Sequence, residues 1–229
     1  MSCNCANGAA LKFTKAAAHY ERRYRRRGLD TAQKHLVRGL KAQGIEGLSL
    51  FDIGSGVGAL DLELLKAGAA SARVMDAAPG MIESARRLAN KMALSEKMDF
   101  RAEEFLSVAD VQPEADIVLL DKVLCCLENP KKMIGASASK ARRLYAVSFP
   151  RDSFIAKIVF KGTALLGRLL RWSFYPSYHE PSALAGWIKD EGFSEAYSGR
   201  TVIWQILVYR RENGRDIPAG NHSKEAIHR

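Results

Sequence analysis

Apolar and polar positions along the chain switch repeatedly between helical and strand spacing. After Asp30, a residue type that favours helix starts, apolar side chains recur at helical intervals as far as Gly44. The run 48–53 is short and apolar and ends in glycines, and helical spacing returns over residues 60–66. This order predicts a strand, a glycine-rich turn and a helix, which together form the first β-α unit of a sheet.

The same alternation continues through most of the remaining chain. It predicts further strands over residues 72–76, 98–102, 115–121 and 143–149, and helices over 81–92, 130–140 and 181–191. An antiparallel pair is expected to close the sheet with residues 196–199 and 202–209. The strand over 115–121 is expected to be central, because its unbroken apolar run suits a parallel strand covered on both faces.

The two ends of the chain depart from this pattern. Residues 1–28 are interpreted as an N-terminal arm, mobile over its first ten residues, with a basic helix over 12–27 that stops at Gly28. The polar residues 212–229 are expected to form a disordered tail. The main domain is therefore predicted to span residues 29–211.

An insertion follows the fifth predicted strand. Residues 154–172 have the pattern of an amphipathic helix, and 153–180 are interpreted as a cap that contributes to a substrate site. The insertion is not expected to cross a membrane, because charges interrupt its apolar run too often. These charges are Lys157, Lys161, Arg168 and Arg171.

The turn after the first predicted strand carries the clearest chemical signal. Gly54, Gly56 and Gly58 allow a tight turn and a close approach of a ligand to the backbone, and the next helix offers free N–H groups. A nucleotide-like cofactor is therefore expected. A dinucleotide site favours the spacing Gly-x-Gly-x-x-Gly, whereas this chain has acids at Asp52, before the glycines, and at Asp76, after the next strand.

These glycines and acids resemble motifs I and II of the class I, Rossmann-like S-adenosylmethionine-dependent methyltransferases. The resemblance implies an α/β fold with a mostly parallel seven-stranded sheet and helices on both faces, here with a helical arm and a cap after strand five. It also implies S-adenosyl-L-methionine as the cofactor. In that family the acid at Asp52 helps to orient the methionyl part, and the acid at Asp76 accepts hydrogen bonds from the ribose hydroxyls.

The resemblance covers roughly residues 30–150. Residues 76–81 look like the family's Asp-x-Ser-Pro-x-Met turn, with Ala78 in place of serine. Residues 100–105 fall where a family acid binds the adenine amino group, a role implied for Glu104 with Glu103 as the alternative. The remaining cofactor contacts that the resemblance implies are Ser55, Ala77, Met81, Phe105, which would cover the adenine ring, and Asp121.

The same fold directs the reactive methyl group toward the end of the fourth strand, here residues 120–127. Because the sulfonium is already an activated leaving group, in-line alignment of a small-molecule acceptor can supply much of the catalysis. The residues expected to contact the acceptor are Tyr24, Lys122, Cys125, Cys126, Trp172, Tyr175 and Tyr178. His19, Tyr20 and His179 are the candidates for a general base, because histidine titrates near neutral pH.

Two adjacent cysteines at this end of the sheet admit a different acceptor. Cys125 and Cys126, together with Cys3 and Cys5 on the arm, offer thiols to a soft metal or metalloid ion, and their placement resembles arsenite methyltransferases. Other parts of that signature are missing, and a buried cysteine is often a small apolar residue. The sequence therefore leaves a soft-ion site and inert cysteines as alternatives.

Three other interpretations remain. Residues 119–124 and 148–152 look distantly like magnesium-protoporphyrin O-methyltransferases, and the aromatic cap suits a flat or apolar substrate. The basic run 22–27 allows an RNA methyltransferase recruited through phosphates, but the Asp/Asn-Pro-Pro-Tyr/Phe and Pro-Cys motifs of base methylation are missing, so a nucleic-acid partner is not expected. The third interpretation is a cofactor-binding protein without transferase activity.

The composition bears on the number of domains, the charge and the compartment of the protein, and says less about its reaction. The 229 residues suit one domain with appendages, and 35 Lys plus Arg against 25 Asp plus Glu give a formal charge of +10, which leaves a solvated basic helix face and an anionic partner as alternatives. The N-terminus lacks a basic segment followed by an apolar one, so a cytoplasmic location is expected. In that reducing compartment the four cysteines are expected to be free thiols.

Overall fold

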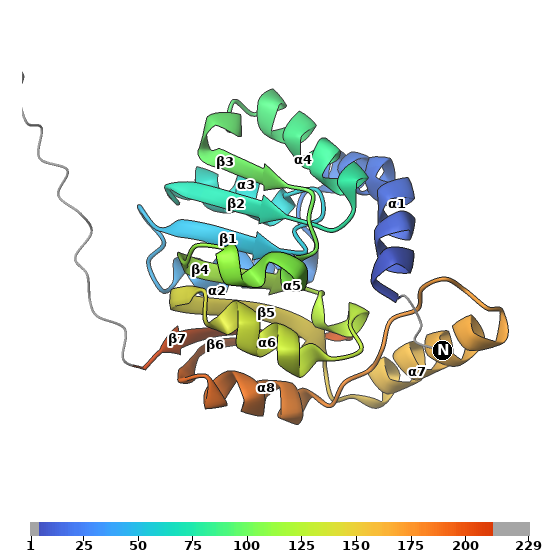
Figure 1. The fold of residues 1–229 in the computed structure, drawn as a ribbon. Coiled ribbons are helices and arrows are strands. Elements are labelled where there is room, and N and C mark those ends of the chain that lie inside the picture. The colour runs from blue at the N-terminus through green and yellow to red at the C-terminus, as the bar shows by residue number, and fades with distance from the viewer. Residues whose placement is uncertain (1–4, 213–229) are drawn as a thin grey trace, which may run out of the picture.

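A seven-stranded sheet lies at the centre of the molecule (Figure 1). The structure is a computed structural model that describes residues 5–212, with side chains from residue 8 on. The strands are β1 (Ser49–Ile53), β2 (Ser71–Met75), β3 (Met98–Arg101), β4 (Ala115–Asp121), β5 (Ala141–Pro150), β6 (Phe193–Arg200) and β7 (Trp204–Arg211). Their order across the sheet is β3-β2-β1-β4-β5-β7-β6.

The first five strands run parallel, and β7 lies antiparallel to both β5 and β6. This arrangement confirms the predicted mostly parallel α/β sheet with a closing antiparallel pair. Chain order reverses between β1 and β4, which are neighbours in the sheet. In open α/β sheets, ligands bind at the carboxyl ends of the strands at such a reversal.

Helices cover both faces of the sheet (Figure 1). The first face carries α1 (Cys5–Arg27), α2 (Thr31–Lys41), α3 (Ala59–Lys66) and α4 (Pro79–Lys91). The second face carries α5 (Phe105–Val108), α6 (Pro130–Ala138) and α8 (Pro181–Asp190). Short 3-10 turns are η1 (Ser95–Lys97), η2 (Ala109–Val111) and η3 (Leu124–Cys126), and α7 (Phe154–Leu169) projects at one edge.

β4 shows why the sheet needs two apolar layers. Ile117 and Leu119 belong to the core on the first face, and Val118 and Leu120 to the core on the second. All four side chains are fully buried, because successive residues of a strand point to opposite faces. The central position predicted from the apolar run of this strand is confirmed.

The N-terminal helix is longer than predicted. α1 begins at Cys5 instead of residue 12, so the expectation of a mobile segment is wrong for residues 5–10. Alanines and Leu11 make this stretch a good helix former, and Gly8 packs closely on the backbone of Ser173. The helix ends as predicted at Gly28, which has a positive φ of 65°. Residues 1–4 and the expected tail from 213 on lie outside the described residues.

The cap begins where β5 ends, and its helix, α7, is shorter than predicted. α7 stops at Leu169 instead of residue 172, because Arg171 takes a left-handed φ of 51° and the Trp172 N–H turns back to the Gly167 carbonyl. β5 continues to Pro150, where it still pairs with Trp204 of β7. Within residues 5–212, no helix is long and apolar enough to cross a membrane.

Candidate active site at the carboxyl edge of the sheet

The glycine turn that joins β1 to α3 is shaped by its close neighbours. Gly54 has a φ of 74°, and a Cβ atom added there would lie 2.5 Å from a methyl group of Val123. Gly56 also has a positive φ, but a Cβ atom added there would meet no atom within 4 Å. The turn is therefore closed on the side of Gly54 and open at Gly56, where a ligand has access to the backbone.

Asp76 follows β2 directly and joins two turns. One carboxylate oxygen accepts a hydrogen bond of 2.8 Å from the Gly56 N–H, and the other accepts one of 2.8 Å from the Ala78 N–H. Burial raises the pKa of Asp76, while these two N–H groups act in the opposite direction. Each oxygen keeps a second lone pair, so the carboxylate can also accept hydrogen bonds from a ligand.

Asp52, near the end of β1, forms a buried carboxyl pair with Asp61 of α3. The two side chains are 1% and 0% exposed and lie within hydrogen-bonding range of each other. Burial and then the charge of Asp61 raise the pKa of Asp52 well above its usual range, and burial raises that of Asp61 to about 7. Near neutral pH, the pair therefore shares at least one proton.

Several polar atoms around the turn are buried and have no hydrogen-bond partner. Among the described residues these include Oδ1 of Asp52, Oγ of Ser55 and Oγ1 of Thr14. Thr14 belongs to α1, which crosses the start of α4 so closely that a Cβ atom added at Gly80 would lie 2.7 Å from the Thr14 carbonyl oxygen. Unpaired buried polar groups are costly, so these atoms mark where a polar ligand would find donors and acceptors.

The end of β4 is fastened to α2 by a polar network. Asp121 accepts hydrogen bonds from the Ser148 hydroxyl and from the Gln33 amide, the latter at 3.1 Å. Gln33 and Asp30 also form the capping box at the start of α2, which confirms Asp30 as the predicted N-cap. Neither Gln33 nor Ser148 was expected from the sequence to take part in the site.

Lys122 completes this network. Its ammonium group lies 2.7 Å from the Asp30 carboxylate and 3.3 Å from that of Asp121, and its backbone has a left-handed φ of 61°. Burial lowers the pKa of Lys122, but the charges of Asp121 and Asp30 outweigh it and raise the pKa. In this structure the charge of Lys122 is therefore neutralised inside the protein, and its expected contact with an acceptor stays a prediction.

The two adjacent cysteines lie in η3, directly after this network. The thiols of Cys125 and Cys126 both point to the Lys122 carbonyl oxygen, at 3.3 and 3.6 Å. The hydrogen bond with Cys126 and burial raise the pKa of Cys125 well above its usual range, which keeps this thiol protonated at neutral pH. Cys3 and the Cys5 side chain lie outside the described residues, so the four-cysteine site stays a prediction.

The described side chains do not add further metal ligands near this pair. Among residues 8–212, no group of three or more His, Cys, Asp or Glu side chains is arranged to hold a metal ion. The backbone carbonyl of Cys125 instead accepts a hydrogen bond of 2.7 Å from the Ser177 N–H of the cap. The cysteine loop, residues 122–127, is thus joined to the returning segment of the cap, residues 170–180, which leads from α7 to α8.

The returning segment carries the aromatic side chains expected at the acceptor site. His179 is 2.8 Å from the Leu127 carbonyl oxygen, so its Nε2 is engaged with the backbone. The Tyr175 ring packs on Gly167 of α7, and the buried hydroxyl of Tyr178 has no partner. Trp172 is partly exposed, with the Lys12 ammonium 5.9 Å above its ring.

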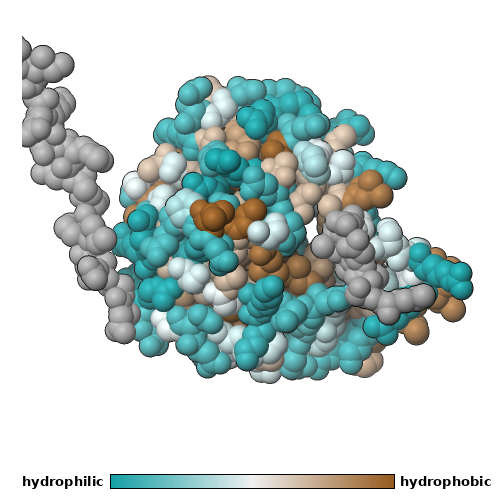
Figure 2. Space-filling view, viewed as in Figure 1, coloured by the Kyte–Doolittle hydropathy of each residue, from teal (hydrophilic) through white to brown (hydrophobic). Residues whose placement is uncertain are grey.

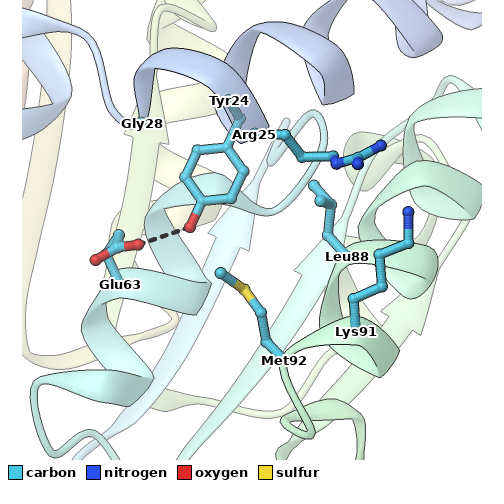
Figure 3. Close-up of a pocket in the computed structure, with 7 residues that line it drawn as sticks. All are labelled: Tyr24, Arg25, Gly28, Glu63, Leu88, Lys91 and Met92. Carbon is cyan, nitrogen blue, oxygen red and sulfur yellow. Dashed lines mark hydrogen bonds between the residues drawn. The ribbon is translucent and has the colours of Figure 1, made fainter.

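Other expected site residues lie on α1, apart from the cap. His19 is exposed and contacts Tyr20 edge to face, with 5.9 Å between the ring centres. Tyr24 donates a hydrogen bond of 2.6 Å to Glu63. The Tyr24 ring lines a cavity of about 340 Å³. Figure 3 shows the ring with the other lining residues, which are Arg25, Gly28, Glu63, Leu88, Lys91 and Met92.

That cavity lies between α1, α3 and α4, and none of the residues of the glycine turn lines it. At the carboxyl edge itself, α1 packs on the start of α4 through Thr14 and on the cap through Phe13, whose ring lies 5.7 Å from that of Phe174. The expected cofactor region is therefore covered by α1 in this structure.

The side chains expected to contact the adenine are engaged in contacts within the protein. Glu104 is the N-cap of α5 and accepts hydrogen bonds from the N–H groups of Leu106 and Ser107. Phe105 is buried and packs edge-on against Phe51 at 5.8 Å. Met81 is buried in the first-face core, whereas Ala77 is exposed. The adenine and other cofactor contacts expected of these residues stay predictions.

Sequence comparison identifies the domain that holds this site. A profile of the methyltransferase domain family matches residues 51–140. The match runs from within β1 to the residue before β5, so it contains the glycine turn, Asp76 and Asp121. This segment is therefore similar to methyltransferase domains. No match was found among curated proteins.

Solved structures extend the likeness beyond the matched segment. Magnesium protoporphyrin IX methyltransferase from Synechocystis PCC 6803, with bound SAH, is 24% identical with a TM-score of 0.64, over 79% of this chain and 81% of that one. An O-methyltransferase family protein from Burkholderia thailandensis is 16% identical with a TM-score of 0.62, over 80% and 59%. The cyclase SpnF is 12% identical with a TM-score of 0.61, over 78% and 80%.

At these identities the likeness concerns the fold. One of the three proteins is a cyclase, so the same architecture accompanies different reactions. The reaction of this chain therefore has to be argued from its own residues.

Proposed function

We propose that this chain transfers the methyl group of S-adenosyl-L-methionine to a small-molecule acceptor. The observation that carries the proposal is Asp76, whose carboxylate joins the Gly56 N–H and the Ala78 N–H beside an open stretch of backbone. A carboxylate held in this way at the end of β2 suits a ligand with neighbouring hydroxyl groups, such as a ribose.

The unpartnered polar atoms support the same ligand. Asp52, Ser55 and Thr14 each bury an oxygen without a partner, and all three belong to elements that meet near the turn. A cofactor with hydroxyl, ammonium and carboxylate groups supplies donors and acceptors that apolar ligands lack. The residues present therefore fit S-adenosylmethionine.

Each residue then has a separate task in binding. The bound cofactor supplies a methyl group on positively charged sulfur. Asp76 holds the ribose hydroxyls with its free lone pairs, and Asp52 offers its unpartnered Oδ1 to the methionyl part as a hydrogen-bond acceptor. The Gly56 backbone leaves room for the ligand, because no side chain projects there.

The acceptor is proposed to lie between η3 and the returning segment of the cap. Ser177 and His179 fix that segment to the backbone of the cysteine loop, and the unpartnered hydroxyl of Tyr178 is the proposed polar contact. The cofactor held by Asp76 and Asp52 would supply its methyl group by in-line displacement, and η3 with the cap segment would hold the acceptor atom in line with the carbon–sulfur bond. Alignment of the acceptor is then the main task of the protein.

Binding of S-adenosylhomocysteine, measured by isothermal titration calorimetry, tests the first part of this proposal. The wild-type chain is expected to bind, and Asp76→Asn to bind at least about tenfold more weakly, because an amide is a poorer acceptor than a carboxylate for ribose hydroxyls. Asp110→Asn is the matched control, since Asp110 is exposed in η2 and distant from the turn in sequence.

Equal affinities of wild type and Asp76→Asn would overturn the role of Asp76. Absence of measurable binding to the wild type would overturn the cofactor. Activity is then followed with methyl-labelled S-adenosylmethionine and a panel of small acceptors, and label that appears only on RNA would replace the proposed acceptor class.

A further inference from the structure

α7 turns an unusually apolar surface toward solvent. Phe154, Leu165 and Leu169 are 78%, 70% and 77% exposed. The complete set of exposed large apolar side chains from the start of α7 to the residues just after it is Phe154, Ile155, Ile158, Val159, Leu165, Leu166, Leu169, Leu170 and Trp172. In a helix packed against a core, apolar side chains of this kind normally face inward.

The helix meets the rest of the protein through a different side. Its buried residues are Ala156, Phe160 and Gly167, which recur at helical spacing on one stripe. Phe160 contacts Trp204 at 5.7 Å, and Gly167 lets the Tyr175 ring approach. At 100° per residue, Phe154, Ile158, Leu165 and Leu169 lie opposite the buried stripe, and Ile155, Val159 and Leu166 lie on one flank beside them. These residues form an apolar ridge on α7, the helix that projects from the molecule in Figure 1.

Positive charges accompany this ridge. Residues 153–179 contain no Asp or Glu, but they contain Lys157, Lys161, Arg168 and Arg171. At 100° per residue, Lys157, Lys161 and Arg168 form a row between the apolar ridge and the buried stripe. Within the protein, Lys157 pairs with Asp152, the ammonium groups of Lys157 and Lys161 lie 5.9 and 6.0 Å from the Tyr178 ring centre, and the Arg168 guanidinium lies 5.8 Å from the Tyr175 ring centre. Figure 2 shows hydrophobic and hydrophilic atoms next to each other at this end of the molecule.

We propose that α7 docks on an anionic lipid bilayer, with its apolar ridge in the interfacial layer and its basic row against the lipid headgroups. This inference goes beyond the proposed methyl transfer and does not depend on it. An amphipathic helix with Phe, Leu and Trp on one face and Lys and Arg beside it binds such interfaces through both apolar burial and charge. The formal charge of +10 adds long-range attraction to the same surface.

A bilayer fits this ridge better than another protein molecule does. In a symmetric dimer through α7, the two basic rows would come close together, and Asp152, the acid just before α7, is already paired with Lys157 of its own row. A single projecting helix is also convex, so a protein partner would need a matching groove, whereas lipid tails adapt to its shape. With 16 residues, α7 is about 24 Å long at 1.5 Å per residue and carries three charges, so it lies along the surface.

Sedimentation with lipid vesicles tests the proposal. The whole chain is mixed with vesicles of phosphatidylcholine alone or of phosphatidylcholine with phosphatidylglycerol, and the bound fraction is measured against lipid concentration. Leu165→Glu and Leu169→Glu are two independent variants of the ridge. Val111→Glu is the matched control, because Val111 is 80% exposed on η2 and the substitution makes the same change in charge.

The wild type and Val111→Glu are expected to bind the anionic vesicles equally. Each α7 variant is expected to bind at least about tenfold more weakly, because a carboxylate in the interfacial layer opposes burial of the ridge. Equal binding of all four proteins would overturn the proposal, since a basic protein then binds through its net charge alone. A different result would also overturn the proposal: the wild type does not bind the vesicles but forms a dimer in ultracentrifugation, and Leu165→Glu dissociates that dimer. The ridge would then be assigned to contact with a second copy of the chain.

Discussion

The carboxyl pair of Asp52 and Asp61 places a titratable group inside the protein next to the proposed cofactor site. Asp61 is fully buried, and burial raises its pKa from 3.8 to about 7. The folded protein therefore holds this proton more tightly than the unfolded chain does. The resulting stability is complete below about pH 4 and is lost as the pH rises through about 7.

Asp61→Asn removes this dependence and gives the Asp52 carboxyl group an amide donor. We expect the free energy of unfolding at about pH 8 to rise by about 2 kcal/mol or more, because a pKa shift of this size corresponds to about 4 kcal/mol. At about pH 4 the variant and wild type should be similar. Urea unfolding at the two pH values measures the difference, and a variant that is less stable at both would show that the acid makes a favourable contact.

The same pair shows where sequence analysis stops at the residue scale. Asp52 was selected through its place before the glycines, whereas Asp61 is an acid in the first turn of a helix, a common position on protein surfaces. Nothing in the neighbouring residues indicates that its side chain is buried. The capping role of Glu104 was equally hidden, because α5 has only four residues and shows no helical period.

At the scale of elements, α2 depends on one side chain for two functions. Asp30 caps the helix and also holds Lys122 at 2.7 Å. Asp30→Ala should reduce the free energy of unfolding by about 2 kcal/mol or more, since loss of a cap alone costs about 1 kcal/mol and the Lys122 charge is left with fewer partners.

Asn129→Ala is the comparison for this prediction, because Asn129 caps α6 with one hydrogen bond and belongs to no charged network described here. Thermal or urea unfolding of both variants separates the two contributions. If Asp30→Ala costs no more than Asn129→Ala, the contact with Lys122 adds nothing to stability.

Helices and strands with a complete hydrophobic repeat could be predicted from the sequence. Their contacts with distant parts of the chain could not. The apolar run of β4 and the spacing after Asp30 indicated the correct strand and helix. The bond between Gln33 and Asp121 joins positions 88 residues apart, and no local pattern records it. The sequence also marked α7 as amphipathic but not which side faces the protein, because small residues at 156 and 167 form the packed side.

At the scale of the whole molecule, α1 connects parts that lie far apart in the chain. Glu21 pairs with Arg87 of α4 at 2.9 Å, and the Phe13 ring lies 5.7 Å from the Phe174 ring of the cap. Since α1 also covers the proposed cofactor region, a bound cofactor has to be enclosed by this helix, and the helix has to open before the cofactor can leave.

Hydrogen exchange measured by mass spectrometry tests this arrangement. Saturating S-adenosylhomocysteine should slow exchange in peptides from α1 around Thr14, because opening of the helix then also requires ligand release. Peptides from β6 and β7, which pair far from the turn, are the internal control. Unchanged exchange in α1 at full cofactor occupancy would separate this helix from cofactor binding.

β5 extends beyond the end of β4, and this extension limits how the cap can move. β5 remains paired with β7 as far as Pro150, two residues beyond the partner of Asp121, and α7 starts four residues later. The cap is therefore attached to a strand that is hydrogen-bonded almost up to the start of α7. A change in the tilt of the cap relative to the sheet would require β5–β7 pairs to break. If α7 rests on a bilayer, the paired end of β5 sets the angle between the membrane plane and the sheet, so the proposed acceptor site between η3 and the cap keeps a constant orientation toward the lipid.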